Sequence, residues 1–260
     1  MPEINTGGVS TETEIPIFTV IPRTPSACDV VIHEVWGLVP HIEDICRRVG
    51  KLGFAALAPD LYWRHKKLLT PNNIQKAMQG VWDLSLEERR DALKVKTAIA
   101  RKGLGRTALE TASILYSQQF RDEILADTVQ CVEQAHSAYD RVAVLGFCLG
   151  GGLSLGVAAS SKHLRSVVAF YGEPPKREDI ARISSPILTI YAERDEIINA
   201  RVPAFVKGAM ESGKDLTLKT YPSTRHGFFN DTRTDLYKEK EANDAWELTR
   251  WFLENTLVRR

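Results

Sequence analysis

The stretch 142–159 constrains the fold more than any other part of the chain. It reads Val-Ala-Val-Leu-Gly-Phe-Cys-Leu-Gly-Gly-Gly-Leu-Ser-Leu-Gly-Val-Ala-Ala. Its first half is β-branched and apolar, as in a strand buried on both faces, and its second half is small and apolar, as in a helix packed tightly on a sheet. Gly146, Gly150 and Gly151 remove side chains that would clash where a strand reverses into a helix. The pattern predicts a sharp strand-to-helix turn at Cys148.

This turn matches the nucleophile elbow of α/β-hydrolases, with Cys148 in the nucleophile's place. In that fold an acid and then a histidine follow the nucleophile, on loops after later strands. The apolar segment Pro186–Ala192 leads into Glu-Arg-Asp and puts Asp195 on a loop, and Leu216–Tyr221 leads into a loop that carries His226. We therefore predict a catalytic triad in which His226 accepts the thiol proton and Asp195 holds its tautomer.

Three other interpretations of the same stretch compete with the elbow. Its 18 uncharged residues are long enough for a membrane span, but five of them are glycine. Gly146, Gly150 and Gly152 have the spacing of a short-chain dehydrogenase loop, with Glu173 where a ribose-binding acid would lie, but Leu145 replaces the expected threonine. A structural cysteine would be the better interpretation of the stretch alone, since free cysteine is commonly buried.

The chain resembles the dienelactone hydrolases, a branch of the α/β-hydrolase fold, over about residues 27–257. The resemblance rests on four segments: Gly-Phe-Cys-Leu-Gly-Gly from 146, Ala-Glu-Arg-Asp from 192, His-Gly-Phe from 226 and His-Glu-Val-Trp-Gly from 33. It implies that the chain opens a lactone or cleaves a small activated ester through a thioacyl-enzyme intermediate. It also implies that Glu34 contacts the resting thiol of Cys148 and takes its proton when substrate arrives. No metal or organic cofactor is needed.

The tetrahedral oxyanion of such a reaction needs fixed hydrogen-bond donors. The backbone N–H of Leu149, the first residue of the predicted helix, is one candidate, and that of Val35 is the other. Relatives that open dienelactones hold the substrate carboxylate with two arginines, one of them four residues beyond the histidine. Asn230 stands there in this chain. The resemblance therefore predicts a preference for neutral lactones or esters, or a different set of residues that binds a carboxylate. The candidate substrate contacts are Trp36, Tyr62, Arg89, Arg90, Phe228, Asn230 and Arg233.

Composition limits the remaining possibilities. The 260 residues, with 43% hydrophobic and 26% charged, predict a single domain with a large core. A net charge of +1, with lysine and arginine scattered, argues against nucleic-acid or membrane partners and favours a small-molecule substrate. The N-terminus lacks signal-peptide features and the four cysteines lack zinc spacing, so we expect a cytoplasmic protein without a metal. The oligomeric state stays open, a homo-oligomer included.

The predicted fold is an α/β-hydrolase fold, with a mostly parallel sheet and helices on both faces. Residues 1–13 are expected to be flexible. Strands are predicted at 14–21, 27–32, 54–58, 142–147, 164–171, 186–192 and 216–221. After the third strand, residues 63–121 read as a helical insertion, either a lid over the ligand end of the sheet or an enlarged edge. Within it, a capping box at Ser85 opens a helix to Lys102, and Arg106–Phe120 forms another.

Two functional alternatives remain open from the sequence. The first is an NAD(P)-dependent short-chain reductase that uses the glycine turn. The second is a non-catalytic receptor with the hydrolase fold, which binds a ligand or is slowly acylated by it.

Overall fold

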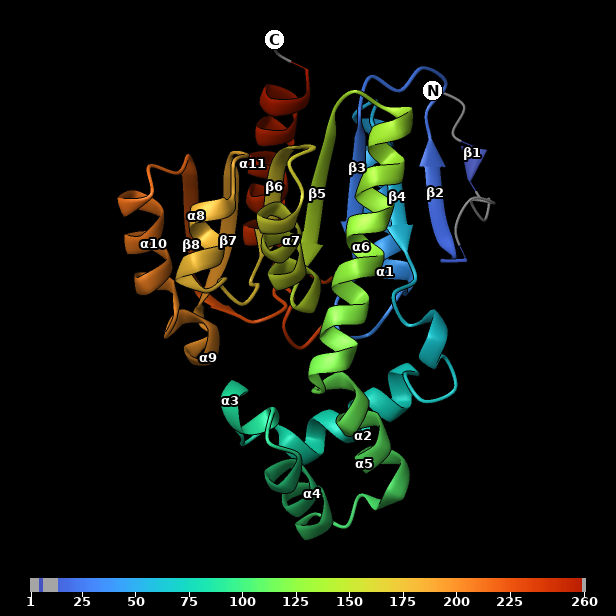
Figure 1. Ribbon diagram of the computed structural model, residues 1–260, viewed down its shortest axis with the longest axis vertical. Coiled ribbons are helices and arrows are strands. Elements are labelled where there is room, and N and C mark those ends of the chain that lie inside the picture. Colours follow the sequence, from blue (N-terminus) through green and yellow to red (C-terminus); the bar gives the residue numbers. More distant parts are fainter. Residues whose placement is uncertain (1–4, 7–13, 259–260) are drawn as a thin grey trace.

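The computed structural model describes residues 5–6 and 14–258, which form an eight-stranded sheet with helices on both faces (Figure 1). The strand order is β1-β2-β4-β3-β5-β6-β7-β8, with antiparallel pairing at β1 and β2 and parallel pairing from β4 to β8. This confirms the predicted mostly parallel sheet. The strands are β1 (Asn5–Thr6), β2 (Ile17–Ile21), β3 (Cys28–Ile32), β4 (Ala55–Pro59), β5 (Val142–Phe147), β6 (Leu164–Phe170), β7 (Ile187–Arg194) and β8 (Leu216–Arg225).

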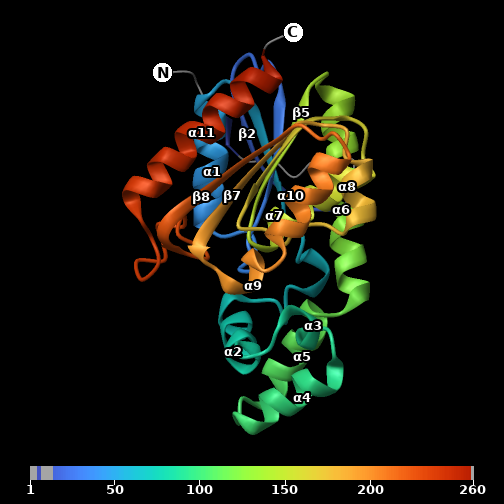
Figure 2. The ribbon, with the colours of Figure 1, turned by 90° about the vertical axis from the view of Figure 1, so that its left-hand side faces the viewer.

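Helices cover the two faces of this sheet (Figure 2). An apolar layer of buried side chains lies on each face. Side chains alternate along β3, so that Val30 and Ile32 pack with one layer and Val31 with the other. The layer on Val31's side is built on α1 (Pro40–Lys51) and α11 (Glu239–Leu257). The opposite layer is built on α6 (Gln118–Ala138), α7 (Leu149–Ser160), α8 (Arg177–Arg182) and α10 (Val202–Glu211), and the short α9 (Glu196–Asn199) precedes α10.

A run of short helices between β4 and α6 lies beyond the carboxyl ends of the parallel strands (Figure 1). We call Trp63–Leu115 the helical segment. It has an apolar core of its own: Ala77, Val81, Val95, Ile99, Ala108 and Ala112. Its helices are η1 (Trp63–His65), α2 (Pro71–Val81), α3 (Leu86–Arg89), α4 (Ala92–Arg101) and α5 (Gly105–Leu115). Whether it moves as a lid stays a prediction.

The helix boundaries inside this segment differ from those predicted. The single helix expected from Ser85 to Lys102 is wrong, because the Asp91 side chain accepts hydrogen bonds from the next backbone N–H groups and begins α4. The capping box at Ser85 is confirmed, but it opens only the short α3. The helix expected to run to Phe120 ends at Leu115, because the Ser117 side chain caps α6, which begins at Gln118.

Two further expectations concern the N-terminus and the stretch 142–159. Asn5 and Thr6 form β1, which pairs with β2, and the rest of 1–13 lies outside the described residues. The expected flexibility of 1–13 stays a prediction. The stretch 142–159 forms β5 and α7, and among the described helices none is both long and apolar enough to cross a bilayer.

Candidate active site

Five polar side chains follow the ends of five parallel strands. Cys148, Tyr171, Asp195 and His226 come directly after β5, β6, β7 and β8, and Glu34 comes two residues after β3. Because parallel strands end at one edge of a sheet, these side chains gather where open α/β sheets bind their ligands.

The chain turns sharply at Cys148. This residue has a φ of 56° and a ψ of −115°, a backbone conformation that residues other than glycine rarely adopt. A Cβ atom on Gly146 would lie 2.1 Å from the carbonyl oxygen of Gly150, and one on Gly150 would lie 2.4 Å from that of Ile32. The structure therefore confirms the predicted strand-to-helix turn at Cys148, with glycines that permit close backbone contact.

The thiol of Cys148 lies beside an imidazole that is itself held by a carboxylate. The distance from Cys148 Sγ to His226 Nε2 is 3.0 Å, and that from His226 Nδ1 to Asp195 Oδ2 is 2.5 Å. Asp195 also accepts a backbone hydrogen bond from Ile198 N–H, which fixes its carboxylate at the start of α9. Cys148 is partly exposed, whereas the other three cysteines, Cys28, Cys46 and Cys131, are buried.

The surroundings of His226 favour its protonated form. Burial lowers the pKa of His226, but the charge of Cys148 and the hydrogen bond to Asp195 outweigh burial and raise this pKa well above its usual value. The Asp195 carboxylate stabilises an imidazolium at this position. The arrangement can thus hold a proton on His226 next to the Cys148 sulfur.

Glu34 is buried, and each of its carboxylate oxygens holds a donor. The Tyr171 hydroxyl donates to Oε1 at 3.0 Å and Asn230 Nδ2 donates to Oε2 at 2.6 Å. The hydrogen-bond partner of the Cys148 sulfur in this structure is His226 rather than Glu34. Burial, and then the charge of Glu34, raise the pKa of Tyr171, which stays a protonated donor. Sequence reasoning missed Tyr171, although its place as the last residue of the predicted strand 164–171 was a signal.

The two candidate oxyanion donors lie on neighbouring elements. Leu149 begins α7, and N–H groups in the first turn of a helix have no acceptor within that helix. The Val35 carbonyl accepts a 2.9 Å hydrogen bond from the Tyr62 hydroxyl, and Tyr62 is buried. His33 Nε2 accepts a hydrogen bond from Leu61 N–H, so Nδ1 carries the proton that it donates to the Glu34 carbonyl at 2.7 Å. Hydrogen bonds from the Tyr62 hydroxyl and the His33 ring therefore hold the loop that carries Val35.

Four of the predicted substrate contacts are engaged elsewhere, among them Tyr62, which is buried and donates to the Val35 carbonyl. Arg89 is buried and donates to the carbonyls of Leu84 and Trp82. Arg90 forms an ion pair with Glu173, with nitrogen-to-oxygen distances of 2.9 and 3.0 Å. Phe228 is fully buried and packs on the ring of Tyr171.

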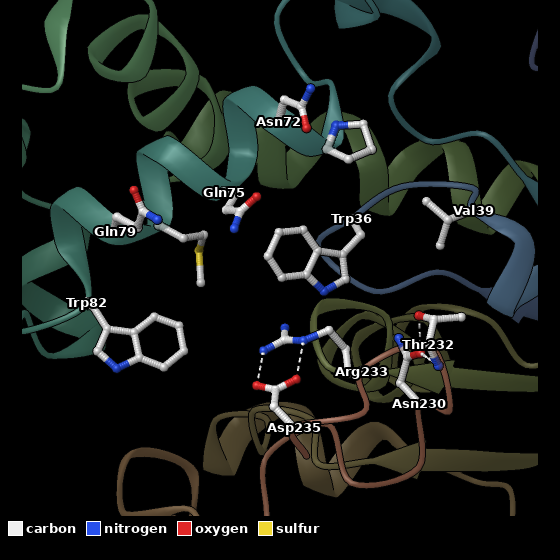
Figure 3. Close-up of a pocket in the computed structure, with 12 residues that line it drawn as sticks. Trp36, Val39, Asn72, Gln75, Gln79, Trp82, Asn230, Thr232, Arg233 and Asp235 are labelled. Carbon is white, nitrogen blue, oxygen red and sulfur yellow. Dashed lines mark hydrogen bonds and ion pairs between the residues drawn. The ribbon is translucent and has the colours of Figure 1, made fainter. Parts of the chain in front are cut away.

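Trp36, Asn230 and Arg233 do come together, in a cleft of about 550 Å³ between α2 and the loops that follow β3 and β8 (Figure 3). Asn230 forms part of the cleft wall and also donates to Glu34. The cleft therefore adjoins the site at the strand ends.

Two features of the alternative dinucleotide loop are already engaged within the protein. The space in front of Gly150 is filled by the Ile32 backbone, and Glu173 is bound by Arg90 and Arg201. Within residues 5–6 and 14–258, no three His, Cys, Asp or Glu side chains lie close enough together to hold a metal ion.

Comparisons with known proteins agree with this geometry. The family model described as "Dienelactone hydrolase family" matches residues 16–257. The chain belongs to the dienelactone hydrolase family. "Putative carboxymethylenebutenolidase" of Saccharolobus solfataricus is 36% identical over 245 residues, covering 92% of this chain and 93% of that protein. "Protein usf" of Aquifex pyrophilus is 32% identical over 235 residues, covering 88% of each chain.

The crystal structure titled "Putative Dienelactone Hydrolase" from Klebsiella pneumoniae shares the fold, with a TM-score of 0.71 and 21% identity over 100% of both chains. The chain thus has the α/β-hydrolase fold of the dienelactone hydrolase family, and membership identifies it as a hydrolase of esters or lactones. The reductase and receptor alternatives gain no support from these comparisons.

Proposed function

We propose that this dienelactone hydrolase family member cleaves small lactones or activated esters with Cys148 as the nucleophile, through a thioacyl-enzyme intermediate. The single observation that supports this most is the 3.0 Å contact from Cys148 Sγ to His226 Nε2, continued to Asp195. A free thiol is only slightly ionised near neutral pH, so a cysteine nucleophile needs a base within hydrogen-bond reach. His226 is in that place, and its raised pKa favours the thiolate and imidazolium pair.

In the first step, the Cys148 sulfur attacks the substrate carbonyl carbon, and the electron pair of the C=O bond moves onto oxygen. The N–H groups of Leu149 and Val35 stabilise this oxyanion. The His226 Nε2–H group then gives its proton to the alkoxide as the carbon–oxygen bond breaks, and the acyl group stays on sulfur. Losing one oxyanion donor typically costs ~3–4 kcal/mol of barrier, so the loop fixed by Tyr62 matters as much as the base.

In the second step, water attacks the thioester while His226 Nε2 takes one of its protons. The tetrahedral intermediate collapses, expels the Cys148 thiolate and releases the carboxylic acid. Glu34 precedes Val35 in the chain, and we infer that its bonds to Tyr171 and Asn230 hold the oxyanion loop in place. The same two hydrogen bonds also disperse the negative charge of Glu34, which would otherwise disfavour a thiolate at Cys148.

The test is hydrolysis of a para-nitrophenyl ester by wild-type protein and by Cys148→Ala. We expect Cys148→Ala to lower kcat by more than ~10³-fold, because it removes the nucleophile. Iodoacetamide should inactivate the wild type, with mass spectrometry finding the modification on Cys148. Cys131→Ala is the matched control: burial raises the pKa of Cys131 to about 12, so this thiol should not contribute. Inactivation that follows Cys28, Cys46 or Cys131 would disprove the assignment.

A further inference from the structure

The cleft beside the strand ends has few charged groups in its lining. Two indoles, several amides and one hydroxyl surround it, and Arg233 and Asp235 are its only charged side chains among the described residues. The full lining is Trp36, Val39, Pro71, Asn72, Gln75, Met78, Gln79, Trp82, Asn230, Thr232, Arg233 and Asp235.

The two charged side chains neutralise each other. Arg233 Nε and Nη2 donate to the two carboxylate oxygens of Asp235, both at 3.0 Å. The hydrogen bond to Arg233 lowers the pKa of Asp235, so the pair stays ionised near neutral pH. The Arg233 guanidinium also lies over the Trp36 ring, 5.7 Å from its centre, in the middle of the cleft (Figure 3). The cation that a substrate carboxylate would need is therefore already paired within the protein.

The polar groups left over in the cleft are uncharged. Asn72, Gln75 and Gln79 are exposed along one face of α2, and within the described residues no hydrogen bond engages their side-chain amides. Asn230 is not available in the same way, because it donates to Glu34 and accepts from Thr232. The available partners thus suit hydroxyl and carbonyl groups held against an indole.

The cleft continues from the oxyanion loop. Trp36, which lines the cleft, is the residue directly after Val35, whose N–H is a proposed oxyanion donor. A substrate whose carbonyl oxygen lies at Val35 N–H can therefore place its remaining part against Trp36.

From these contacts we infer that the cleft binds an uncharged part of the substrate that carries hydroxyl or carbonyl groups, and that Asp235 disfavours carboxylated substrates by occupying Arg233. This inference rests on the proposed ester hydrolysis. Asp235 lies two residues away and takes up the Nε and Nη2 donors of Arg233, so a substrate carboxylate would have to displace Asp235 from that edge or bind at the remaining donors next to a like charge. Asp235 is thus a specificity-determining residue.

The experiment compares two substrates that differ only in charge: para-nitrophenyl hydrogen glutarate, which is an anion, and its neutral methyl ester. In the wild type kcat/KM should be higher for the methyl ester. Asp235→Asn should raise the ratio of kcat/KM for the anion to kcat/KM for the methyl ester by about 10-fold, the factor that one charge-assisted hydrogen bond provides. Arg233→Gln combined with Asp235→Asn is the control, and it should abolish the gain.

The outcomes separate this inference from the proposed function. A wild type that prefers the anion, or an Asp235→Asn variant with an unchanged ratio, overturns the role of Asp235. If neither ester shows turnover that Cys148→Ala removes, the proposed function fails instead. In that case calorimetry with glutarate still tests the cleft, because Asp235→Asn should bind it more tightly than the wild type does. Equal glutarate affinity in the two proteins would overturn the inference.

Discussion

The sheet region (the eight strands with α1 and α6–α11) packs the glycines at its strand ends in a different way from Gly80 in the helical segment. At the strand ends, backbone meets backbone: a Cβ on Gly150 would lie 2.4 Å from the carbonyl oxygen of Ile32. In the helical segment, a Cβ on Gly80 would meet the Ile99 side chain at 2.6 Å. A side chain can rotate away, but a strand end cannot move without displacing the neighbouring site residues. The site geometry is therefore fixed by contacts that allow little adjustment.

The sheet region and the helical segment also differ in where their carboxylates lie. The sheet region buries Asp29 with no hydrogen-bond partner in the described part of the chain. In the helical segment, carboxylates lie at the surface and are paired, as with Asp83 to Lys102 and Glu88 to Lys94. The stability of the sheet region should thus respond to pH, and the attachment of the helical segment should respond to salt.

The largest expected effect comes from Gly150→Ala, with Gly80→Ala as its counterpart. Gly150→Ala should cost ~3 kcal/mol of unfolding free energy and most of the activity, because backbone atoms must separate. Gly80→Ala should change stability by less than ~1 kcal/mol, since the higher helix propensity of alanine offsets the displacement of Ile99. Urea unfolding and ester hydrolysis measure both variants. Equal losses would remove the distinction between the two regions.

The same distinction explains which parts of the site could be predicted from sequence. The order of Cys148, Asp195 and His226 at strand ends was sufficient to place them together, because the parallel sheet brings strand ends to one edge. The bond between Tyr171 and Glu34 joins residues far apart in the chain, and no local pattern indicates it. The contact of the sulfur with His226 rather than Glu34 also depends on tertiary packing.

In the helical segment the predictions failed at helix ends. Ser85 and Asp91 both cap helices, but only Ser85 was read as a cap, so two helices were predicted as one. Arg89 and Arg90 looked equivalent in sequence, yet one is buried against carbonyls and the other pairs with Glu173. Apolar periodicity identifies helices reliably where they pack on a sheet, and less so where side-chain caps decide each end.

The second expected effect concerns the pH dependence of stability. Burial raises the pKa of Asp29 to about 8, so the folded protein keeps this carboxyl protonated while the unfolded chain ionises it above about pH 4. At low pH Asp29 is protonated in both states and does not lower the free energy of unfolding. That free energy then falls as pH rises towards 8, because only the unfolded chain ionises this carboxyl. Asp29→Asn removes the loss and should raise the unfolding free energy by ~2–4 kcal/mol at pH 7.

Chemical denaturation of wild type and Asp29→Asn between pH 5 and pH 8 tests this, and the difference should grow with pH. Asp140→Asn is the control, since Asp140 is exposed on the turn before β5 and should show no such trend. A constant difference across the range would mean that Asp29 is ionised in the folded protein.

The smallest expected effect concerns the ion pairs that join the helical segment to the sheet region. Arg201, the N-cap residue of α10, binds Glu87 of α3 and also Glu173, and Glu173 in turn binds Arg90. These side chains are partly exposed, so Arg201→Gln should cost only ~0–1 kcal/mol of global stability. Its effect should appear locally instead, as faster hydrogen exchange in α3 and faster alkylation of Cys148.

Arg177→Gln is a matched control for this last prediction, because Arg177 forms an exposed ion pair with Glu211 entirely within the sheet region. It should leave exchange in α3 unchanged. High salt should reproduce the Arg201→Gln result in the wild type, since salt screens exposed pairs. If exchange in α3 is the same in wild type and Arg201→Gln, the ion pairs of Arg201 do not hold α3 on the sheet region, and charge at this contact does not distinguish the two regions.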